Sequence, residues 1–394
     1  MWIESIALTE FRSYERQQLQ LQAGITIFVG PNAQGKTNLL EAIHRAARGT
    51  SHRVAGDQPL LRQGAQEAAI HLVCVTDERR RRTIDVAFGN VARTRTRVDG
   101  QQLRRNSDLN GVLPLVLFAP EDLAIVRGDP EQRRRFLDDA LSQRRPAYAA
   151  ARSEYERVLR QRNQLLRQMQ ALSPSAQQAA SATMAAWTEQ LVQFGTQLVA
   201  ARLTALQVLA EPIARHYQFL SGRPERIGVS YVSTISEESN ADATAMPLSD
   251  RSIDPATITE QYRAAIARRA VDEIRRGTTL VGPHRDDVEL RIGDLAARGY
   301  SSHGEAWSLA LALKLATVDL LTEVGDRPVV LLDDVFAELD EHRRQQLAHM
   351  CQDYDQVLVT AAVAADVPLD GHYVTVVRDT GMTILALREE SGES

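Results

Sequence analysis

The pattern of hydrophobic and polar positions predicts alternating strands and one helix in the first third of the chain. Apolar residues alternate with polar ones up to about residue 21 and then form a continuous run from Ile25 to Val29. A helical pattern follows at 38–48. Strand patterns return between 68 and 105, with Arg79–Arg82 at a hairpin turn, and "LPLVLFAP" predicts a buried strand that ends near Pro120.

From Pro130 the pattern changes to a helical one. Residues 130–172 and 181–220 are nearly free of glycine and carry apolar residues at spacings of three and four, which predicts two long helices. The break at "ALSPSAQQ" predicts that they fold back as an antiparallel pair. The sequence leaves open whether this pair is a helical insertion packed on itself or a binding arm.

The remaining residues contain a strand around "IGVSYVS", a polar acidic stretch up to about residue 256 and a helix over 257–276. Alternating strands and helices then resume. We therefore expect three regions: an N-terminal part of a head domain at 1–125, a mostly helical arm at 126–275, and a C-terminal part of the head at 276–394.

Composition is that of a water-soluble globular protein, with 44% hydrophobic and 25% charged residues. No apolar run approaches about 18 residues, so no membrane span is predicted, and the first residues lack the pattern of a secretory signal. We expect a cytoplasmic protein. Cys74 and Cys351 lie in apolar runs and fit no metal or disulfide pattern.

The charged residues bear on two points, namely binding of nucleic acid and the role of lysine. The net charge of −5 gives no global reason to expect nucleic acid, so a DNA-binding surface would have to be local. Lysine occurs only at positions 36 and 314, whereas the other basic residues are arginines. The rarity of lysine indicates that an ammonium group is required at position 36.

A phosphate-binding loop lies between the buried strand and the first helix. Residues 30–37 match G-x-x-x-x-G-K-[ST], in which backbone N–H groups and a helix N-terminus hold phosphates, the lysine reaches the terminal phosphates and the threonine hydroxyl binds Mg²⁺. The residues expected to contact the nucleotide here are Gly30, Pro31, Asn32, Ala33, Gln34, Gly35, Lys36, Thr37 and Asn38.

Two adjacent carboxylates end an apolar strand at Val329–Leu332. Asp333 and Asp334 would repel each other unless a cation lies between them or one of them faces a water, and a Mg²⁺-nucleotide supplies both conditions. We expect Thr37 and Asp333 to hold Mg²⁺, and Asp334 to position or deprotonate the attacking water. Lys36, Asp333 and Asp334 are the candidate catalytic residues. Because about 300 residues separate the two motifs, the ATPase fold must be split by an insertion.

A second anion site is predicted just before the acidic strand. Ser302, Gly304 and Glu305 open an amphipathic helix, where a hydroxyl, backbone N–H groups and the helix dipole point the same way. Alone, this would be an ordinary helix cap. Next to an acidic strand it resembles the signature loop of ABC-type ATPases, which closes over the nucleotide held by another subunit.

Several longer strings resemble the RecF family, short-armed relatives of the SMC-type ATPases. They are "LTEFRSY" (8–14), "GPNAQGKTNLLEAIHRAARGTSHR" (30–53), "LFAPEDLAIVRGDPEQRRRFLDDAL" (117–141), "LVGPHRDD" (280–287), "SSHGE" (301–305) and "LLDDVFAELD" (331–340). The resemblance covers nearly the whole chain and implies an α/β fold, an ABC/SMC-type P-loop ATPase head split by a mostly helical arm.

The resemblance also implies a function and some residue roles. It implies ATP and Mg²⁺ as ligands, an ATP-dependent homodimer, binding of double-stranded DNA at single-stranded gaps, and work with RecO and RecR to load RecA. Arg12 and the Ser51–Arg53 turn would lie by the nucleotide, with Arg53 contacting it, and Asp340 would lie across the dimer seam. Glu121 would occupy the position of a glutamine that senses the γ-phosphate.

Two departures from ABC-type ATPases leave the enzyme activity open. Glu121 supplies no glutamine amide, and "QVLVT" ends in Thr360 and Ala361 without the histidine that many ABC-type ATPases place against the γ-phosphate. We expect a weak DNA-dependent ATPase in which ATP acts more as a clamp than as fuel. The alternative is a nucleotide-binding adaptor that recruits protein partners with negligible turnover. A membrane-transporter ATPase fits poorly, because the arm interrupts the head.

Arginine clusters are the candidate DNA-contacting residues. Because duplex DNA is held largely through its phosphates, arginine-bearing faces on a dimer would grip it without reading bases. A solvated arginine surface is the plainer interpretation of each one. The clusters are Arg79–Arg82, Arg93, Arg95, Arg97, Arg104, Arg105, Arg133–Arg135, Arg144 and Arg145.

Overall fold

The computed structural model describes residues 1–91, 93–236, 254–323, 325–379 and 382–387. They form two compact units. The head unit contains 1–123, 216–223 and 303–394, and the arm unit contains 124–215 and 224–302. The head is therefore assembled from segments far apart in the sequence, as the distance between the two ATPase motifs predicts.

The central sheet of the head has the strand order β15-β14-β3-β13-β12-β8. From β14 to β8 neighbouring strands are parallel, and β15 is antiparallel to β14. The strands are β3 (Gly24–Val29), β8 (Leu115–Phe118), β12 (Val329–Asp333), β13 (Gln356–Ala361), β14 (His372–Asp379) and β15 (Met382–Leu387). β8, β12 and β13 are buried on both faces, which explains their continuous apolar runs.

A second, antiparallel sheet has the order β2-β1-β4-β5-β6-β7. Its strands are β1 (Trp2–Phe11), β2 (Tyr14–Gln20), β4 (Glu67–Val75), β5 (Arg81–Gly89), β6 (Arg95–Val98) and β7 (Gln101–Gln102). The hairpin turn predicted at Arg79–Arg82 lies slightly earlier, between the end of β4 at Val75 and the start of β5 at Arg81. Alternation of buried and exposed residues gives this sheet one core face and one solvent face.

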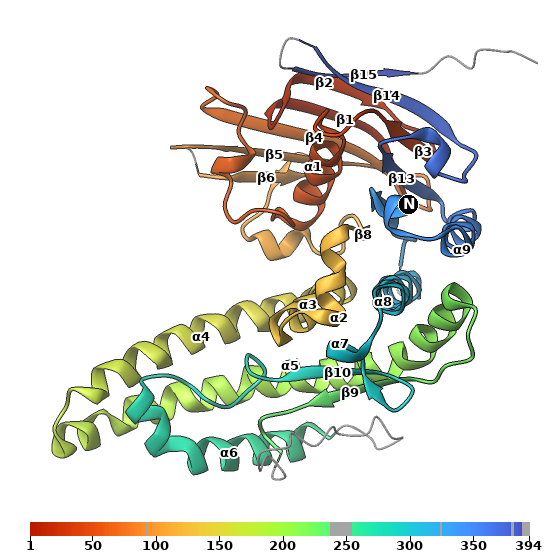
Figure 1. Cartoon of the computed structure of the whole chain (residues 1–394). Coiled ribbons are helices and arrows are strands. Elements are labelled where there is room, and N and C mark those ends of the chain that lie inside the picture. The colour runs from red at the N-terminus through yellow and green to blue at the C-terminus, as the bar shows by residue number, and fades with distance from the viewer. Residues whose placement is uncertain (92, 237–253, 324, 380–381, 388–394) are drawn as a thin grey trace, which may run out of the picture. The chain divides into compact units, whose positions relative to one another are not determined.

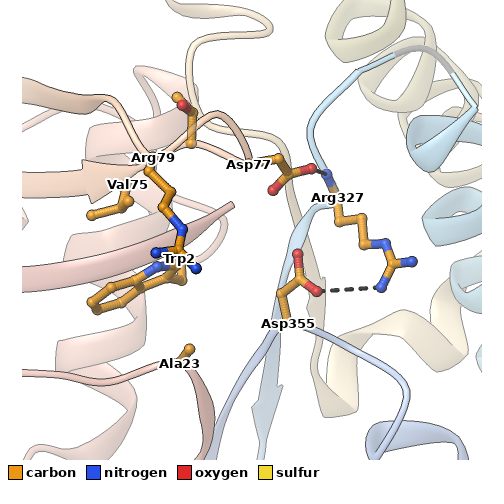
Figure 2. Close-up of a pocket in the computed structure, with 8 residues that line it drawn as sticks. Trp2, Ala23, Val75, Asp77, Arg79, Arg327 and Asp355 are labelled. Atoms are coloured by element: carbon orange, nitrogen blue, oxygen red, sulfur yellow. Dashed lines mark hydrogen bonds and ion pairs between the residues drawn. The ribbon is translucent and has the colours of Figure 1, made fainter.

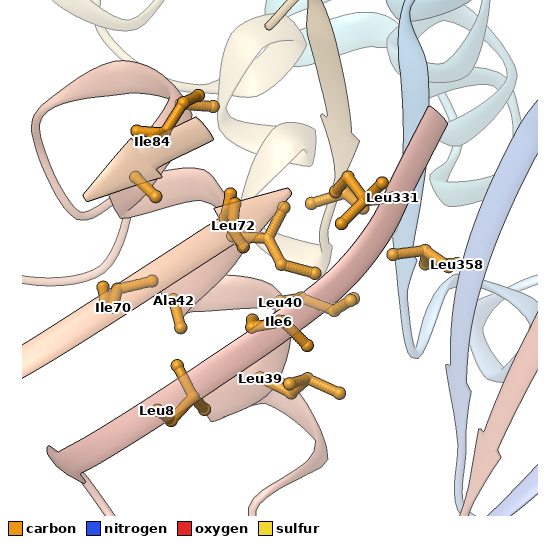
Figure 3. Close-up of a cluster of buried hydrophobic side chains, with 14 of the residues drawn as sticks. Ile6, Leu8, Leu39, Leu40, Ala42, Ile70, Leu72, Ile84, Leu331 and Leu358 are labelled. Atoms are coloured by element: carbon orange, nitrogen blue, oxygen red, sulfur yellow. The ribbon is translucent and has the colours of Figure 1, made fainter. Parts of the chain in front are cut away.

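Helix α1 (Lys36–Arg48) lies between the two sheets and joins them through one hydrophobic core. Its buried side chains contact both layers because apolar residues occur on more than one face of the helix. Figure 3 shows the side chains of Leu39, Leu40 and Ala42 among Ile6, Leu8, Ile70 and Leu72 of the antiparallel sheet and Leu331 and Leu358 of the parallel sheet. The first turn of α1 therefore has a rigid support.

A second core covers the other face of the parallel sheet. It is formed by α8 (His303–Thr322), α9 (Glu341–Cys351) and the 3₁₀ turn Val335–Glu338, with Trp307, Leu311 and Phe336 among its largest members. From Ala306 onward α8 is buried on nearly all sides. Its first residues, which contain the predicted signature loop, are its more exposed end.

The arm unit corrects the prediction of two long helices. Where one helix was expected over 130–172, the structure has α3 (Pro130–Arg144) and α4 (Pro146–Gln170). The break falls at Arg145, which is extended (φ −140°, ψ 103°) because the following ring of Pro146 disfavours the helical conformation of the residue before it. The second predicted helix begins earlier, as α5 (Pro174–Ser221).

The predicted antiparallel pairing is confirmed for α4 and α5. Tyr148 contacts Arg202 through a 3.4 Å hydrogen bond, whereas Arg162, further along α4, donates to Thr188 at 3.1 Å, earlier on α5. The residue numbers of the contacting positions rise along α4 while they fall along α5, so the two helices run in opposite directions. The two helices and α6 (Pro255–Arg276) extend side by side (Figure 1).

A small sheet, β11-β10-β9, completes the arm unit. Its strands are β9 (Ile227–Val232), β10 (Asp287–Ile292) and β11 (Leu295–Ala296), and the short helices are α2 (Leu123–Arg127) and α7 (Ala297–Tyr300). Residues 276–302, expected in the head, group with the arm because β10 pairs with β9 over its whole length. Most of the predicted acidic stretch, 237–253, lies outside the described residues.

Candidate functional site

The phosphate loop follows β3 and leads directly into α1. Ala33 and Gly35 have left-handed φ angles of 66° and 104°, which turn the backbone before the helix begins at Lys36. Gly30 lies so close to β14 that a Cβ on it would be 2.1 Å from the carbonyl oxygen of Val376. Any side chain at position 30 would therefore force β3 and β14 apart.

The loop is supported by the C-terminal hairpin β14–β15, a role that sequence reasoning missed. Thr383 Oγ1 donates to the carbonyl oxygen of Gln34 at 2.8 Å, and Gln34 Oε1 accepts the backbone N–H of Arg378 at 2.6 Å. Ser13 Oγ lies 3.0 Å from Asn38 Nδ2 and 2.7 Å from Thr383 Oγ1. These contacts fix the loop from both sides.

Lys36 is buried inside the loop it belongs to. Its Nζ donates to the carbonyl oxygens of Gly30 at 2.6 Å and Pro31 at 2.9 Å. Burial lowers the pKa of the ammonium group, and the charges of Asp334 and Asp333 partly offset that effect. A terminal phosphate would replace the carbonyl partners with a full negative charge, which favours the ammonium form much more strongly.

The acidic strand meets the phosphate loop through Asp333. Its Oδ1 accepts hydrogen bonds from the hydroxyls of Thr37 at 3.0 Å and Thr360 at 2.7 Å. Asp333 is 4% exposed, and this burial raises the pKa of its carboxyl group although both hydroxyls lower it. Thr360, at the end of β13 where ABC-type ATPases often place a histidine, thus holds the predicted metal carboxylate in position.

Asp334 has a left-handed backbone (φ 54°), which is uncommon for a residue other than glycine. Its backbone N–H donates to Thr360 Oγ1 at 3.0 Å, so the same threonine binds the carboxylate of Asp333 and the backbone of Asp334. Burial raises the pKa of Asp334, the charge of Lys36 lowers it, and Glu338 and Asp366 raise it again. Strained backbone of this kind is typical of functional positions.

Thr37 and Asp333 carry oxygen ligands of the kinds that Mg²⁺ binds in nucleotide sites. A hydroxyl and a buried carboxylate 3.0 Å apart fit two positions of an octahedral oxygen shell, with phosphate oxygens and waters for the rest. Thr37 and Asp333 would hold the ion, and the ion would supply charge to the nucleotide's terminal phosphates.

The predicted Arg12 and Arg53 meet at a buried glutamate that sequence reasoning did not single out. Glu41, fully buried on α1, accepts two hydrogen bonds from Arg12 at 2.8 and 2.9 Å and one from Ser51 at 2.6 Å. Arg53 Nη1 lies 3.6 Å from the same carboxylate and 3.4 Å from Asn38 Oδ1. Although burial by itself would raise the pKa of Glu41, these donors and charges lower it overall.

Glu121 lies in the 3₁₀ turn Pro120–Asp122 at the end of β8. Its charge is one of the smaller contributions to the raised pKa of Asp333, after burial. The neighbouring Asp122 is fixed by a 2.8 Å ion pair with Lys314, the second lysine of the chain. The position expected for a γ-phosphate-sensing amide thus carries a carboxylate.

The predicted signature residues and Asp340 come from two adjacent helix starts. Gly304 and Glu305 lie in the first turn of α8, directly after the exposed Ser302. Asp340 is the N-cap of α9, where its carboxylate accepts the backbone N–H of Arg343 at 2.9 Å. Arg343, which carries no sequence signal of its own, contacts both helix starts.

The candidate DNA-contacting arginines differ in how exposed their guanidinium groups are and in whether they are already paired with a carboxylate. Arg133 is 4% exposed and forms two hydrogen bonds with Asp287 at 2.7 and 2.9 Å, so its guanidinium is not available to DNA. Arg81 and Arg82 pair with Glu4 and Asp99. Arg95 and Arg97 alternate with buried residues on β6 and therefore point together to the solvent face of the antiparallel sheet.

The head also contains a cavity of about 470 Å³ away from these motifs, where β1 begins and β4 ends (Figure 2). Trp2 and Val75 line one side of it. Arg327 pairs with Asp355 at 3.3 Å on the other side and donates its backbone N–H to Asp77. Because acidic and basic groups alternate around this cavity, it lacks the donor-rich lining of a phosphate site.

A phosphate loop after β3, an acidic strand two positions away in the same parallel sheet, and a long helical insertion define an ABC/SMC-type P-loop ATPase head. The family model described as "RecF/RecN/SMC N terminal domain" matches residues 2–378. The DNA replication and repair protein RecF of Cutibacterium acnes is 44% identical over 370 residues, which are 93% of this chain and 94% of that protein. The chain belongs to the RecF family.

Solved structures agree with this assignment. The structure of the recombination mediator protein RecF with ATP matches with a TM-score of 0.86 and 25% identity over 98% of this chain and 97% of that chain. An Smc head bound to the C-winged helix domain of ScpA matches over 99% and 98% of the two chains with a TM-score of 0.57 at 14% identity, which shows likeness of fold. Within the residues that the structure describes, no helix is long and apolar enough to cross a membrane.

Proposed function

We propose that this protein is an ATP-dependent recombination mediator that dimerises on ATP, binds duplex DNA at gaps or junctions, and helps RecO and RecR to load RecA. The observation that carries the proposal is the contact between Thr37 and Asp333, 3.0 Å apart, because it joins the two halves of the ATPase head at the point where Mg²⁺ and the terminal phosphates would bind. The relatives support it, since one is named a DNA replication and repair protein and another a recombination mediator with ATP.

In this function the nucleotide links two copies of the chain. Lys36 and Thr37 of one subunit hold the phosphates, while Ser302, Gly304 and Glu305 of the partner cover them and Asp340 lies across the seam. The N-terminal end of α8 supports this role, because its backbone N–H groups and helix dipole favour an anion. A DNA duplex then contacts the arginine-bearing faces of both subunits.

The test measures association and DNA binding together. Sedimentation should show a shift from monomer to dimer on addition of ATP and Mg²⁺, and the affinity for a gapped duplex should rise over the same ATP range. DNA binding should fall steeply as salt rises, because phosphate contacts release counterions. An increase in DNA affinity at monomer mass would contradict the assignment of the signature loop.

A second function is favoured by one specific feature. Glu121 supplies no amide at the position where ABC-type ATPases have a glutamine, and its negative charge contributes to the raised pKa of Asp333, so the protein would act as a nucleotide-binding adaptor that recruits partners without significant hydrolysis. Phosphate release at saturating ATP and DNA distinguishes the two. Release no faster than that of Asp334→Asn favours the adaptor, whereas faster release favours a weak DNA-dependent ATPase.

A further inference from the structure

One side chain, Arg343, connects the N-terminal parts of α8 and α9 within a subunit. Its Nε donates to Ser308 Oγ at 2.7 Å, and its Nη1 pairs with the carboxylate of Asp340. Ser308 is fully buried in the second turn of α8, whereas Asp340 is the half-exposed N-cap of α9. The guanidinium therefore ties a fixed point in the core to a residue at the surface.

The same guanidinium lies against the backbone of the signature loop. A Cβ built on Gly304 would lie 3.1 Å from Arg343 Nη2 and 3.2 Å from Cζ, closer than side chains normally approach. A glycine at position 304 thus leaves room for the flat guanidinium to lie next to the loop. This is a reason for glycine that is independent of anion binding.

The chemistry of arginine suits this arrangement and that of lysine does not. A guanidinium is planar and has donors pointing in several fixed directions, so it can contact a backbone with its face while two edges bind separate acceptors. An ammonium group can pair with Asp340 but has no flat face for Gly304. The side chain of Arg343 is 17% exposed and that of Asp340 54%, which indicates that the fixed end of the pair is the arginine.

We propose that Arg343 is a positioning residue that holds Gly304 and Asp340 in one arrangement, so that the signature loop and the seam carboxylate reach the partner's nucleotide as a unit. The inference rests on the proposed function, since that function places both residues at the dimer seam. Arg343 acts through these neighbours rather than by touching the nucleotide.

The experiment compares dimerisation with nucleotide binding by the single subunit. Sedimentation in ATP and Mg²⁺ gives the dimer dissociation constant, and a fluorescent ATP analogue at low protein concentration gives the affinity of the monomer. Arg343→Ala should weaken the dimer by about tenfold to a hundredfold, the usual effect of losing hydrogen bonds to a charged group. The affinity of the monomer should not change, because Lys36 and Thr37 are intact.

Two further variants separate positioning from a general loss of structure. Arg343→Lys should keep the thermal midpoint near that of the natural protein but fail to restore the dimer. Ser308→Ala should weaken the dimer by itself but add no further loss in the Arg343→Ala background, since the two share one contact. Gln345→Ala, an exposed change on the same helix, is the matched control and should leave both constants unchanged.

The results of these measurements distinguish failure of the proposed role of Arg343 from failure of the proposed ATP-dependent dimerisation. If the natural protein stays monomeric in ATP, the proposed function and the inference are both overturned. A natural protein that dimerises while Arg343→Ala dimerises equally well overturns the inference alone. So does full rescue by Arg343→Lys, or simple additivity with Ser308→Ala. If Arg343→Ala does not fold, the Arg343→Lys comparison decides.

Discussion

Thr37 and Asp333 are separated by 296 positions in the chain, yet their side chains form a 3.0 Å hydrogen bond. The contact exists because β12 lies two strands from β3 in the parallel sheet, so the carboxyl ends of both strands meet at one edge. Ligands of α/β proteins bind at such edges. The helical arm can therefore interrupt the sequence of the head without moving its two motifs apart.

Lys36 and Asp334 should separate binding from hydrolysis. Lys36→Ala removes the ammonium group inside the loop and should abolish detectable ATP binding in a calorimetric titration. Asp334→Asn keeps the loop and the Thr37–Asp333 contact, so ATP should still bind while phosphate release falls by about a hundredfold or more. The ATP-bound dimer should then accumulate. Equal loss of binding in both variants would remove Asp334 from the catalytic role.

Glu121 is expected to limit turnover. Glu121→Gln removes a negative charge that contributes to the raised pKa of Asp333 and supplies an amide at that position. Phosphate release at saturating ATP and DNA should rise by a factor on the order of ten, equivalent to about 1.4 kcal/mol in the barrier. Glu121→Ala, which removes the charge without supplying an amide, is the control. Unchanged release in both variants would rule out this explanation of slow turnover.

The buried Glu41 should contribute more to the free energy of unfolding than an exposed glutamate such as Glu78. Glu41→Ala leaves Arg12 and Ser51 without their buried acceptor, and breaking a buried ion pair in this way costs about 3–5 kcal/mol in the free energy of unfolding. Urea denaturation of the full chain measures the loss. Glu78→Ala, which removes an exposed pair with Arg80, should have no measurable effect. Equal stability of the two variants would show that the Glu41 cluster is not structural.

The arm should become less stable as the pH is lowered from about 6.5 to about 4. Burial lowers the pKa of His284 to about 4, and its Nδ1 lies 2.7 Å from the hydroxyl of Tyr155. The unfolded chain therefore binds a proton in this window that the native chain does not, so unfolding becomes more favourable as pH falls. The contribution is at most about 3 kcal/mol. Urea titrations of His284→Gln should show a shallower pH dependence, and an unchanged slope would contradict the assignment.

Arg95 and Arg97 should contribute to DNA binding through phosphates. Replacing both with glutamine should weaken binding of every duplex sequence alike and reduce the slope of log affinity against log salt by up to about 2. Gln102→Ala, exposed on the neighbouring strand β7, is the matched control and should leave the slope unchanged. A loss confined to some sequences, or an unchanged salt slope, would place the duplex elsewhere.

The sequence by itself was sufficient to predict the ATPase motifs and most helices and strands, because each of these is specified by neighbouring residues. A buried strand followed by glycines and Lys36 predicts a phosphate loop, and the apolar run before Asp333 predicts the acidic strand. The α4–α5 hairpin also follows from local spacing and a break. The interruption at Arg145 was visible in principle, since Pro146 restricts the residue before it, but the helical pattern on both sides concealed it.

Only the tertiary structure decided which side chains support these motifs. Glu41, Thr360, Thr383 and Arg343 gain their supporting roles from hydrogen-bond partners at least 10 positions away, which no sequence pattern indicates. Arg133 shows the converse, because this one residue of a basic string that suggested DNA contact is buried against Asp287. Hydrogen bonds and burial depend on positions in space, and strand order sets these positions in a way that local patterns do not encode.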